Sequence, residues 1–75
     1  MRYYLVTITY NKVADAEDRP QPKGFNTIDE ACKAFHLYLT QNIKGATVGW
    51  CLAIIFNEYG NVEYMERWQE ETISA

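Results

Sequence analysis

The sequence predicts an α+β fold of two layers, in which one helix packs on one face of a three-stranded, mainly antiparallel sheet. Two observations lead to this prediction. Apolar and polar residues alternate in three segments, as they do in strands that bury one face. One segment, between the first and second of these, has apolar residues at helical spacing. The element order is therefore β-α-β-β, and a chain of 75 residues suits a single domain over residues 1–75.

Residues 2–11 are predicted to form the first strand, because β-branched and aromatic side chains are frequent there. Residues 12–26 have no apolar periodicity, and Pro20 and Pro22 favour an extended path. We therefore expect a mobile loop over about 12–26, and a frayed tail over about 72–75. Alternation divides the first strand into one face with Tyr4, Val6, Ile8 and Tyr10 and another with Tyr3, Leu5, Thr7 and Thr9.

The helix is predicted to begin at Thr27, since Thr27 and Glu30 have the spacing of a capping box. It should run to about Lys44 and end at Gly45 in the left-handed conformation. Leu37 falls on the side that faces water. The stripe predicted to face the sheet contains Ile28, Ala31, Cys32, Phe35, Leu39 and Ile43.

Residues 48–69 are predicted to form a β-hairpin with the loop Glu58-Tyr59-Gly60. Gly60 suits the left-handed position that ends such a loop. This loop pairs Asn57 with Asn61 and keeps the apolar residues of both arms on one face. The register then sets Phe56 opposite Val62, Ile54 opposite Tyr64 and Trp50 opposite Trp68.

The charges of the last strand indicate which face of the sheet the helix covers. Glu63 and Arg67 need water, so their face should point away from the helix. The helix is then predicted to pack on the large side chains, namely Tyr4, Val6, Ile8, Trp50, Leu52, Ile54, Val62, Tyr64 and Trp68. The helix-free face would carry Tyr3, Leu5, Cys51, Ala53, Ile55 and Met65.

The charge distribution argues against a nucleic-acid binder. The net charge is −3, and residues 46–75 carry one arginine against five glutamates, so the cluster of basic residues that phosphate binding requires is missing. No signal peptide is expected, because Tyr3 already begins a strand pattern. The apolar stretch Val48–Phe56 is far shorter than the ~20 residues that span a bilayer. We therefore expect a cytoplasmic protein without a membrane partner.

No catalytic, metal or cofactor site is predicted. Cys32 and His36 are four residues apart on the helix and can touch, but no third group is placed to orient them. The spacing of Asp15, Glu17 and Asp18 matches no calcium loop. Cys32 and Cys51 are expected on opposite sides of the sheet, where they cannot form a disulfide, which fits a reducing compartment.

The most favoured function is that of a non-enzymatic protein-binding or regulatory module that forms a homodimer. Its predicted interaction residues are Tyr3, Leu5, Ile55 and Met65, on the helix-free sheet face or beside an adjoining strand edge. In the alternative, residues 12–26 or the C-terminal tail of the same chain fold over this face.

A second hypothesis is an acidic inhibitor that binds a host nucleic-acid-processing enzyme. No family motif is present. In size, acidity and lack of motifs, the chain is similar to small stand-alone proteins of phages and mobile elements, some of which inhibit host enzymes by binding them. The acidic surface would consist of Glu58, Glu63, Glu66, Glu70 and Glu71.

Overall fold

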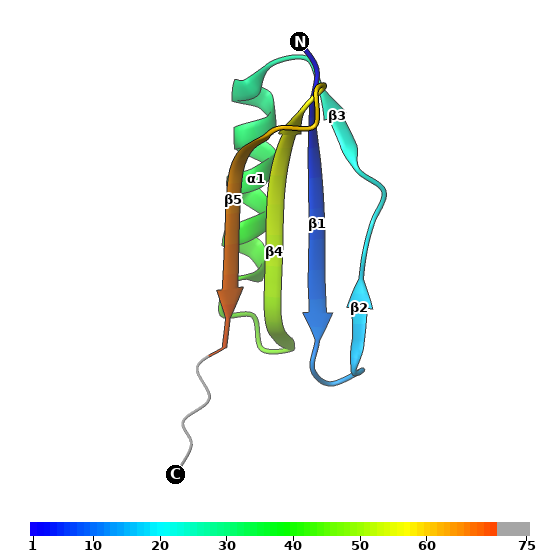
Figure 1. The fold of residues 1–75 in the computed structure, drawn as a ribbon. Coiled ribbons are helices and arrows are strands. Elements are labelled where there is room, and N and C mark those ends of the chain that lie inside the picture. Colours follow the sequence, from blue (N-terminus) through cyan, green and yellow to red (C-terminus); the bar gives the residue numbers. More distant parts are fainter. Residues whose placement is uncertain (71–75) are drawn as a thin grey trace.

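The computed structural model describes residues 1–70 and has one helix on one face of an antiparallel sheet (Figure 1). The elements are β1 (Tyr3–Asn11), β2 (Ala16–Asp18), β3 (Lys23–Phe25), α1 (Ile28–Asn42), β4 (Val48–Asn57) and β5 (Val62–Gln69). The strand order is β2-β1-β4-β5, and β3 also pairs with β1. The α+β class with one covered face is confirmed. The prediction of three strands is wrong, because the sheet has five. The predicted frayed tail, 72–75, lies outside the described residues.

The two additional strands lie in the segment that was predicted to be a mobile loop. After β1, the side chain of Asn11 accepts hydrogen bonds from the amides of Val13 and Ala14, at 2.9 and 3.0 Å, and closes a turn. The chain then returns along the outer edge of β1. β2 pairs with Thr9–Asn11, and β3 pairs with Tyr3–Leu5. Between them, residues 19–22 bow away from β1 (Figure 1).

The helix begins as predicted and ends slightly earlier. Thr27 is the N-cap, and its hydroxyl accepts a hydrogen bond from the amide of Glu30 at 3.2 Å. The helix ends at Asn42, and the left-handed residue is Lys44, with φ of 62°, rather than Gly45. The predicted inward stripe is confirmed. Ala31, Phe35 and Leu39 are buried, and Ile28, Cys32 and Ile43 pack against them.

The hairpin loop is confirmed, but the predicted register holds for only one residue pair beyond it. The amide of Asn57 donates to the carbonyl of Asn61 at 2.9 Å, and Gly60 has φ of 83°. Phe56 lies opposite Val62, as predicted. The register then shifts, because Glu63 is an extra residue in β5. The observed pairs are Ile55 with Tyr64, Ile54 with Met65, Cys51 with Trp68 and Trp50 with Gln69.

This β-bulge reverses the predicted choice of sheet face. Arg67 does lie on the helix-free side, as its charge requires. One extra residue changes which β4 side chains share a face with it, since side chains alternate strictly along a strand. Arg67 lies opposite Leu52, not opposite Cys51 or Ala53. Trp50 and Trp68 are consequently on opposite faces, and the prediction that they are buried neighbours is wrong.

The helix packs on the face with the smaller side chains. Ala31 on the helix, and Cys51 and Ala53 on β4, have no exposed surface. Small residues here let the helix approach β4 while Phe35 and Leu39 fill the space around them. The buried core consists of Leu5, Ala31, Phe35, Leu39, Val48, Cys51, Ala53 and Ile55.

The positive φ of Gly60 in the hairpin loop leads to a prediction about stability. Valine at this position should lower the free energy of unfolding by on the order of 1–2 kcal/mol, since a β-branched residue is strained at positive φ. No atom lies within 4 Å of where a Cβ would be built, so a steric clash does not contribute. Urea unfolding of Gly60→Val measures the cost. Gly60→Asn, which tolerates this conformation, is the control, and equal midpoints for the two variants would contradict the argument.

Candidate functional site

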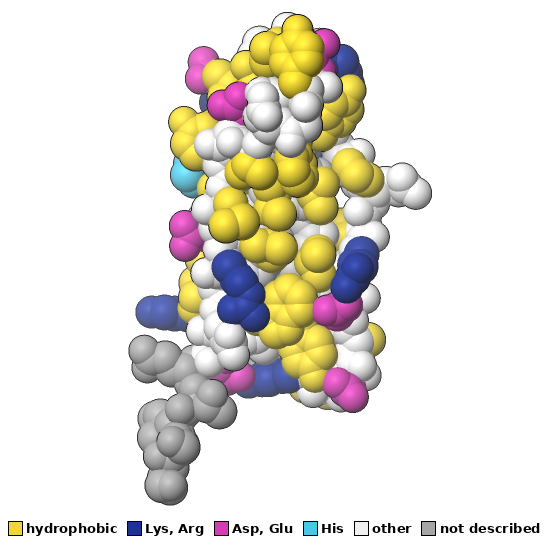
Figure 2. Space-filling model, in the orientation of Figure 1, with side chains coloured by type: hydrophobic (Ala, Val, Ile, Leu, Met, Phe, Trp, Pro, Cys, Tyr) yellow, Lys and Arg dark blue, Asp and Glu magenta, His cyan; other side chains and the backbone are white. Residues whose placement is uncertain are grey.

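The largest unpartnered feature of the fold is the face of the sheet opposite the helix. Apolar side chains run along its whole length in Figure 2. The strand registers place side chains of β1, β4 and β5 there together. This helix-free face consists of Tyr4, Val6, Ile8, Tyr10, Trp50, Leu52, Ile54, Phe56, Val62 and Met65.

Aromatic contacts order one end of the helix-free face. The rings of Tyr10 and Trp50 stack, with 6.1 Å between their centroids and 8° between their planes. The guanidinium of Arg67 lies 5.3 Å from the centre of the Trp50 ring, within the range of a cation–π contact. The hydroxyl of Tyr10 donates to Asp15 at 2.5 Å, and this hydrogen bond raises the pKa of Tyr10. The face therefore has an ordered aromatic end with one cation upon it.

Opposite charges lie at the two sides of this face. Arg67 is on β5, the outermost strand of one side. Glu17 pairs with Tyr10 from β2 at the other side, and it accepts from Arg19 at 2.5 Å. An apolar centre with a polar rim is the usual composition of a protein interface.

The structure separates the four predicted interaction residues. Leu5 and Ile55 are 6% and 0% exposed, and both lie in the core under the helix. Tyr3 is half-buried and packs against the same core. Met65 alone lies on the helix-free face, where it is 62% exposed. The predicted face for Tyr3, Leu5 and Ile55 is therefore wrong, because the bulge at Glu63 was not visible in the alternation pattern.

The glutamates of the proposed acidic surface are partly engaged in local contacts. Glu58 accepts from the amide of Arg2 at 3.0 Å, and Glu63 accepts from the side-chain amide of Asn57 at 3.0 Å. Glu70 forms an ion pair of 2.6 Å with Lys12. Glu66 is exposed on β5, and Glu71 lies outside the described residues.

Both cysteines are free and lie on the helix side of the sheet. The prediction that the sheet separates them is wrong, because Cys51 faces the helix. Burial raises the pKa of the Cys51 thiol. His36 is exposed, and its ring meets Phe35 edge-on at 5.3 Å. Within residues 1–70, no three His, Cys, Asp or Glu side chains are grouped so that they could hold a metal ion.

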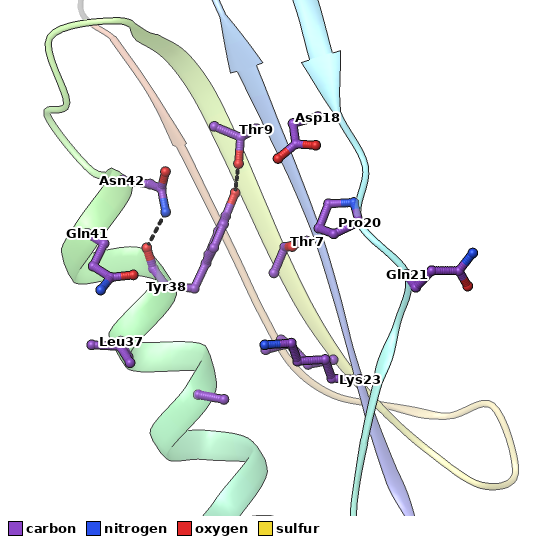
Figure 3. A pocket seen from close by; sticks show the side chains of 12 residues that line it. Thr7, Thr9, Asp18, Pro20, Gln21, Lys23, Leu37, Tyr38, Gln41 and Asn42 are labelled. Atoms are coloured by element: carbon purple, nitrogen blue, oxygen red, sulfur yellow. Dashed lines mark hydrogen bonds between the residues drawn. The ribbon is translucent and has the colours of Figure 1, made fainter.

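A cavity of about 370 Å³ lies on the helix side, between α1 and the bowed segment 19–22 (Figure 3). This cavity was not predicted from the sequence, although Pro20 and Pro22 indicate that this segment cannot pair fully with β1. The hydroxyls of Tyr38 and Thr9 are 2.5 Å apart at one wall, and burial raises the pKa of Tyr38. The cavity is lined by Leu5, Thr7, Thr9, Asp18, Pro20, Gln21, Lys23, Ala34, Leu37, Tyr38, Gln41 and Asn42.

Comparison with protein families, with curated proteins and with solved structures found no match for this chain. None of the helices in residues 1–70 has the length and apolar character needed to cross a membrane.

The two cysteines should differ in reactivity. Cys51 has no exposed surface and a raised thiol pKa, so its reactive thiolate is scarce in the folded protein. Iodoacetamide at mildly alkaline pH should modify Cys32 first, and Cys51 only after unfolding. Because the fold favours the protonated Cys51 thiol, its contribution to stability should be complete below the unfolded pKa and decline as pH rises towards the folded pKa. Mass spectrometry of timed samples tests the order, and equal rates in the folded protein would contradict the placement of Cys51.

Proposed function

We propose that the protein is a non-enzymatic cytoplasmic binding module that acts through the helix-free face, and that the occupant of this face is a second copy of the chain. The observation that carries the proposal is the division of side chains between the two faces. The helix covers the small Cys51 and Ala53 together with Val48 and Ile55, while Trp50, Leu52, Ile54 and Phe56 stay only half-buried on the other face of β4. The two free cysteines fit the reducing conditions of the cytoplasm.

The size of the chain supports self-association. A domain this short buries only roughly 60% of its unfolded surface, so a single core gives little stability. Burying some 600 Å² of apolar surface would contribute roughly 15 kcal/mol before the entropy cost of association, at ~25 cal/mol per Å². Two-fold dimers are the commonest oligomers, and a sheet face is self-complementary when two copies stack.

The charges at the rim favour one orientation of the two copies. A two-fold axis parallel to the strands would place β5 of one copy over β2 of the other. Arg67 pairs with Leu52, and Leu52 pairs with Ile8, so Arg67 lies at the same height along the sheet as Ile8. Glu17 pairs with Tyr10 and lies at the height of Tyr10. These heights differ by two residues, or about 7 Å along the strand. Arg67 of each copy would then approach Glu17 of the other and share it with Arg19, which already pairs with Glu17, whereas an axis across the strands would bring the two Arg67 side chains together.

The acidic surface has less support as an interaction site. Glu58, Glu63 and Glu70 already accept hydrogen bonds or ion pairs within the chain. A basic partner would have to compete with these contacts, whereas the helix-free face has no cover within residues 1–70.

Two adjacent isoleucines give a matched test of the helix-free face. Ile54 is half-buried on that face, and Ile55 has no exposed surface in the core. Ile54→Lys should give a folded monomer, since the lysine can extend into water once the second copy is gone. Ile55→Lys should unfold the protein, since an unpaired ammonium in the core is costly. Multi-angle light scattering gives the mass, and circular dichroism gives the folded fraction. A wild-type monomer at high concentration would refute the dimer.

The orientation is tested by exchanging rim charges. Arg67→Glu and Glu17→Arg should each weaken the dimer, by on the order of threefold to tenfold in Kd, because each places like charges together. The double variant should recover most of the loss. Sedimentation of the four proteins at low salt measures the effect. Additive losses in the double variant would rule out this orientation while leaving the dimer itself intact.

A further inference from the structure

Hydrogen bonds at the two ends of β4 show which way its backbone groups point. The carbonyl of Gly49 accepts from the amide of Glu70 at 2.9 Å, and the amide of Asn57 donates to Asn61 at 2.9 Å. Odd-numbered residues of β4 therefore direct their N–H and C=O groups towards β5. Since these directions alternate along a strand, the even-numbered residues bond to β1.

The same alternation leaves one residue of β1 without a strand partner on its outer side. The backbone groups of the even-numbered residues of β1 bond to β4. The backbone N–H and C=O groups of Tyr3, Leu5, Thr7 and Thr9 therefore point away from β4, towards the outer edge of the sheet. Tyr3 and Leu5 meet β3, and Thr9 meets β2. Thr7 lies at the gap between them, and no backbone hydrogen bond joins it to the described residues 19–22. Its hydroxyl also has no hydrogen-bond partner within residues 1–70.

The prolines explain why this gap stays open. Pro20 and Pro22 have no amide hydrogen to donate, and proline restricts the residue before it. The segment therefore cannot continue the pairing of β2 into β3. It bows outward and leaves Thr7 at the floor of the cavity described above.

The walls of the cavity form a slot. In Figure 3 the side chains of Tyr38 and Pro20 stand on either side of Thr7, while Gln21 points away. Asp18 and Lys23 lie at the two ends, next to Thr9 and Leu5 respectively. Neither forms an ion pair with another residue in 1–70. Opposite charges at the two ends give no preference for a net anion or a net cation.

We propose that this cavity binds a small, uncharged, planar amide. A cyclic or primary amide presents an acceptor and a donor side by side, and the backbone C=O and N–H of Thr7 point side by side from the outer edge of β1. The flat group would lie between the Tyr38 ring and Pro20, and the Thr7 hydroxyl would provide a further contact. The volume of about 370 Å³ is within the range of small-molecule sites. This site is on the opposite side of the sheet from the proposed dimer face and does not depend on it.

Two pairs of probes test the amide in NMR titrations of the full chain labelled with ¹⁵N. Uracil is a cyclic amide, and 1,3-dimethyluracil has the same ring without N–H donors. Nicotinamide is a primary amide, and nicotinate replaces the amide with a carboxylate. We expect a saturable shift of the Thr7 amide signal with uracil or nicotinamide at millimolar concentration. The matched compound should bind at least about tenfold more weakly, as loss of one hydrogen bond implies.

Variants of the helix locate the binding. Ala34→Leu should fill the cavity and abolish the shift, whereas Thr40→Leu places the same side chain outside the lining and should preserve it. Thr7→Val keeps the shape of the floor without the hydroxyl and should weaken binding several-fold. Ile54→Lys should leave binding unchanged, which separates this site from the dimer.

Three results would overturn the proposal. The first is the absence of any saturable shift with both amides up to their solubility limits. The second is equal affinity for uracil and its dimethyl derivative. The third is binding that survives in a folded Ala34→Leu variant. Binding of uracil alone or of nicotinamide alone would support the site and identify the amide as cyclic or primary.

Discussion

The packing of Ala31 of α1 against Cys51 and Ala53 of β4 is the constraint on which the rest of this structure depends. Ala31 meets a strand whose helix-facing side chains include Cys51 and Ala53, and all three are completely buried. Ala31 packs over these two small residues, while the larger Val48 and Ile55 lie before and after them along the strand and complete the core. The other large residues of β4, Trp50, Leu52, Ile54 and Phe56, occupy the opposite face. The exposed apolar surface is thus a direct consequence of how the helix packs.

The bulge at Glu63 makes this arrangement compatible with the sequence of β5. Without it, Tyr64 and Trp68 would point away from the helix. With it, Trp68 packs against the core, Tyr64 approaches Phe35 at 6.3 Å, and Arg67 lies over Trp50. The side-chain amide of Asn57 donates to the displaced Glu63, so the extra residue is tied to the buried end of β4. A single unpaired residue therefore decides which surface is available to a partner.

Local signals in the sequence predicted local features well. The Thr27 cap, the helical stripe from Ile28 to Ile43 and the left-handed Gly60 all follow from interactions within a few residues. The face of the sheet did not follow, because its prediction relied on an unbroken register across the whole hairpin, and β-bulges have no firm sequence signature. The cavity also depends on distant parts. The prolines predict that residues 19–22 avoid pairing, but only the fold shows that Thr7 lies beside them and Tyr38 across from them.

The most direct test of this account is an isotope-filtered NOE experiment on an equal mixture of labelled and unlabelled protein. It detects contacts between copies, residue by residue. We predict intermolecular contacts from the methyl groups of Ile8, Leu52 and Ile54, and none from Leu5, Leu39 or Ile55. The absence of contacts between copies, or contacts from Leu5 and Ile55 in place of Ile8 and Ile54, would contradict the account.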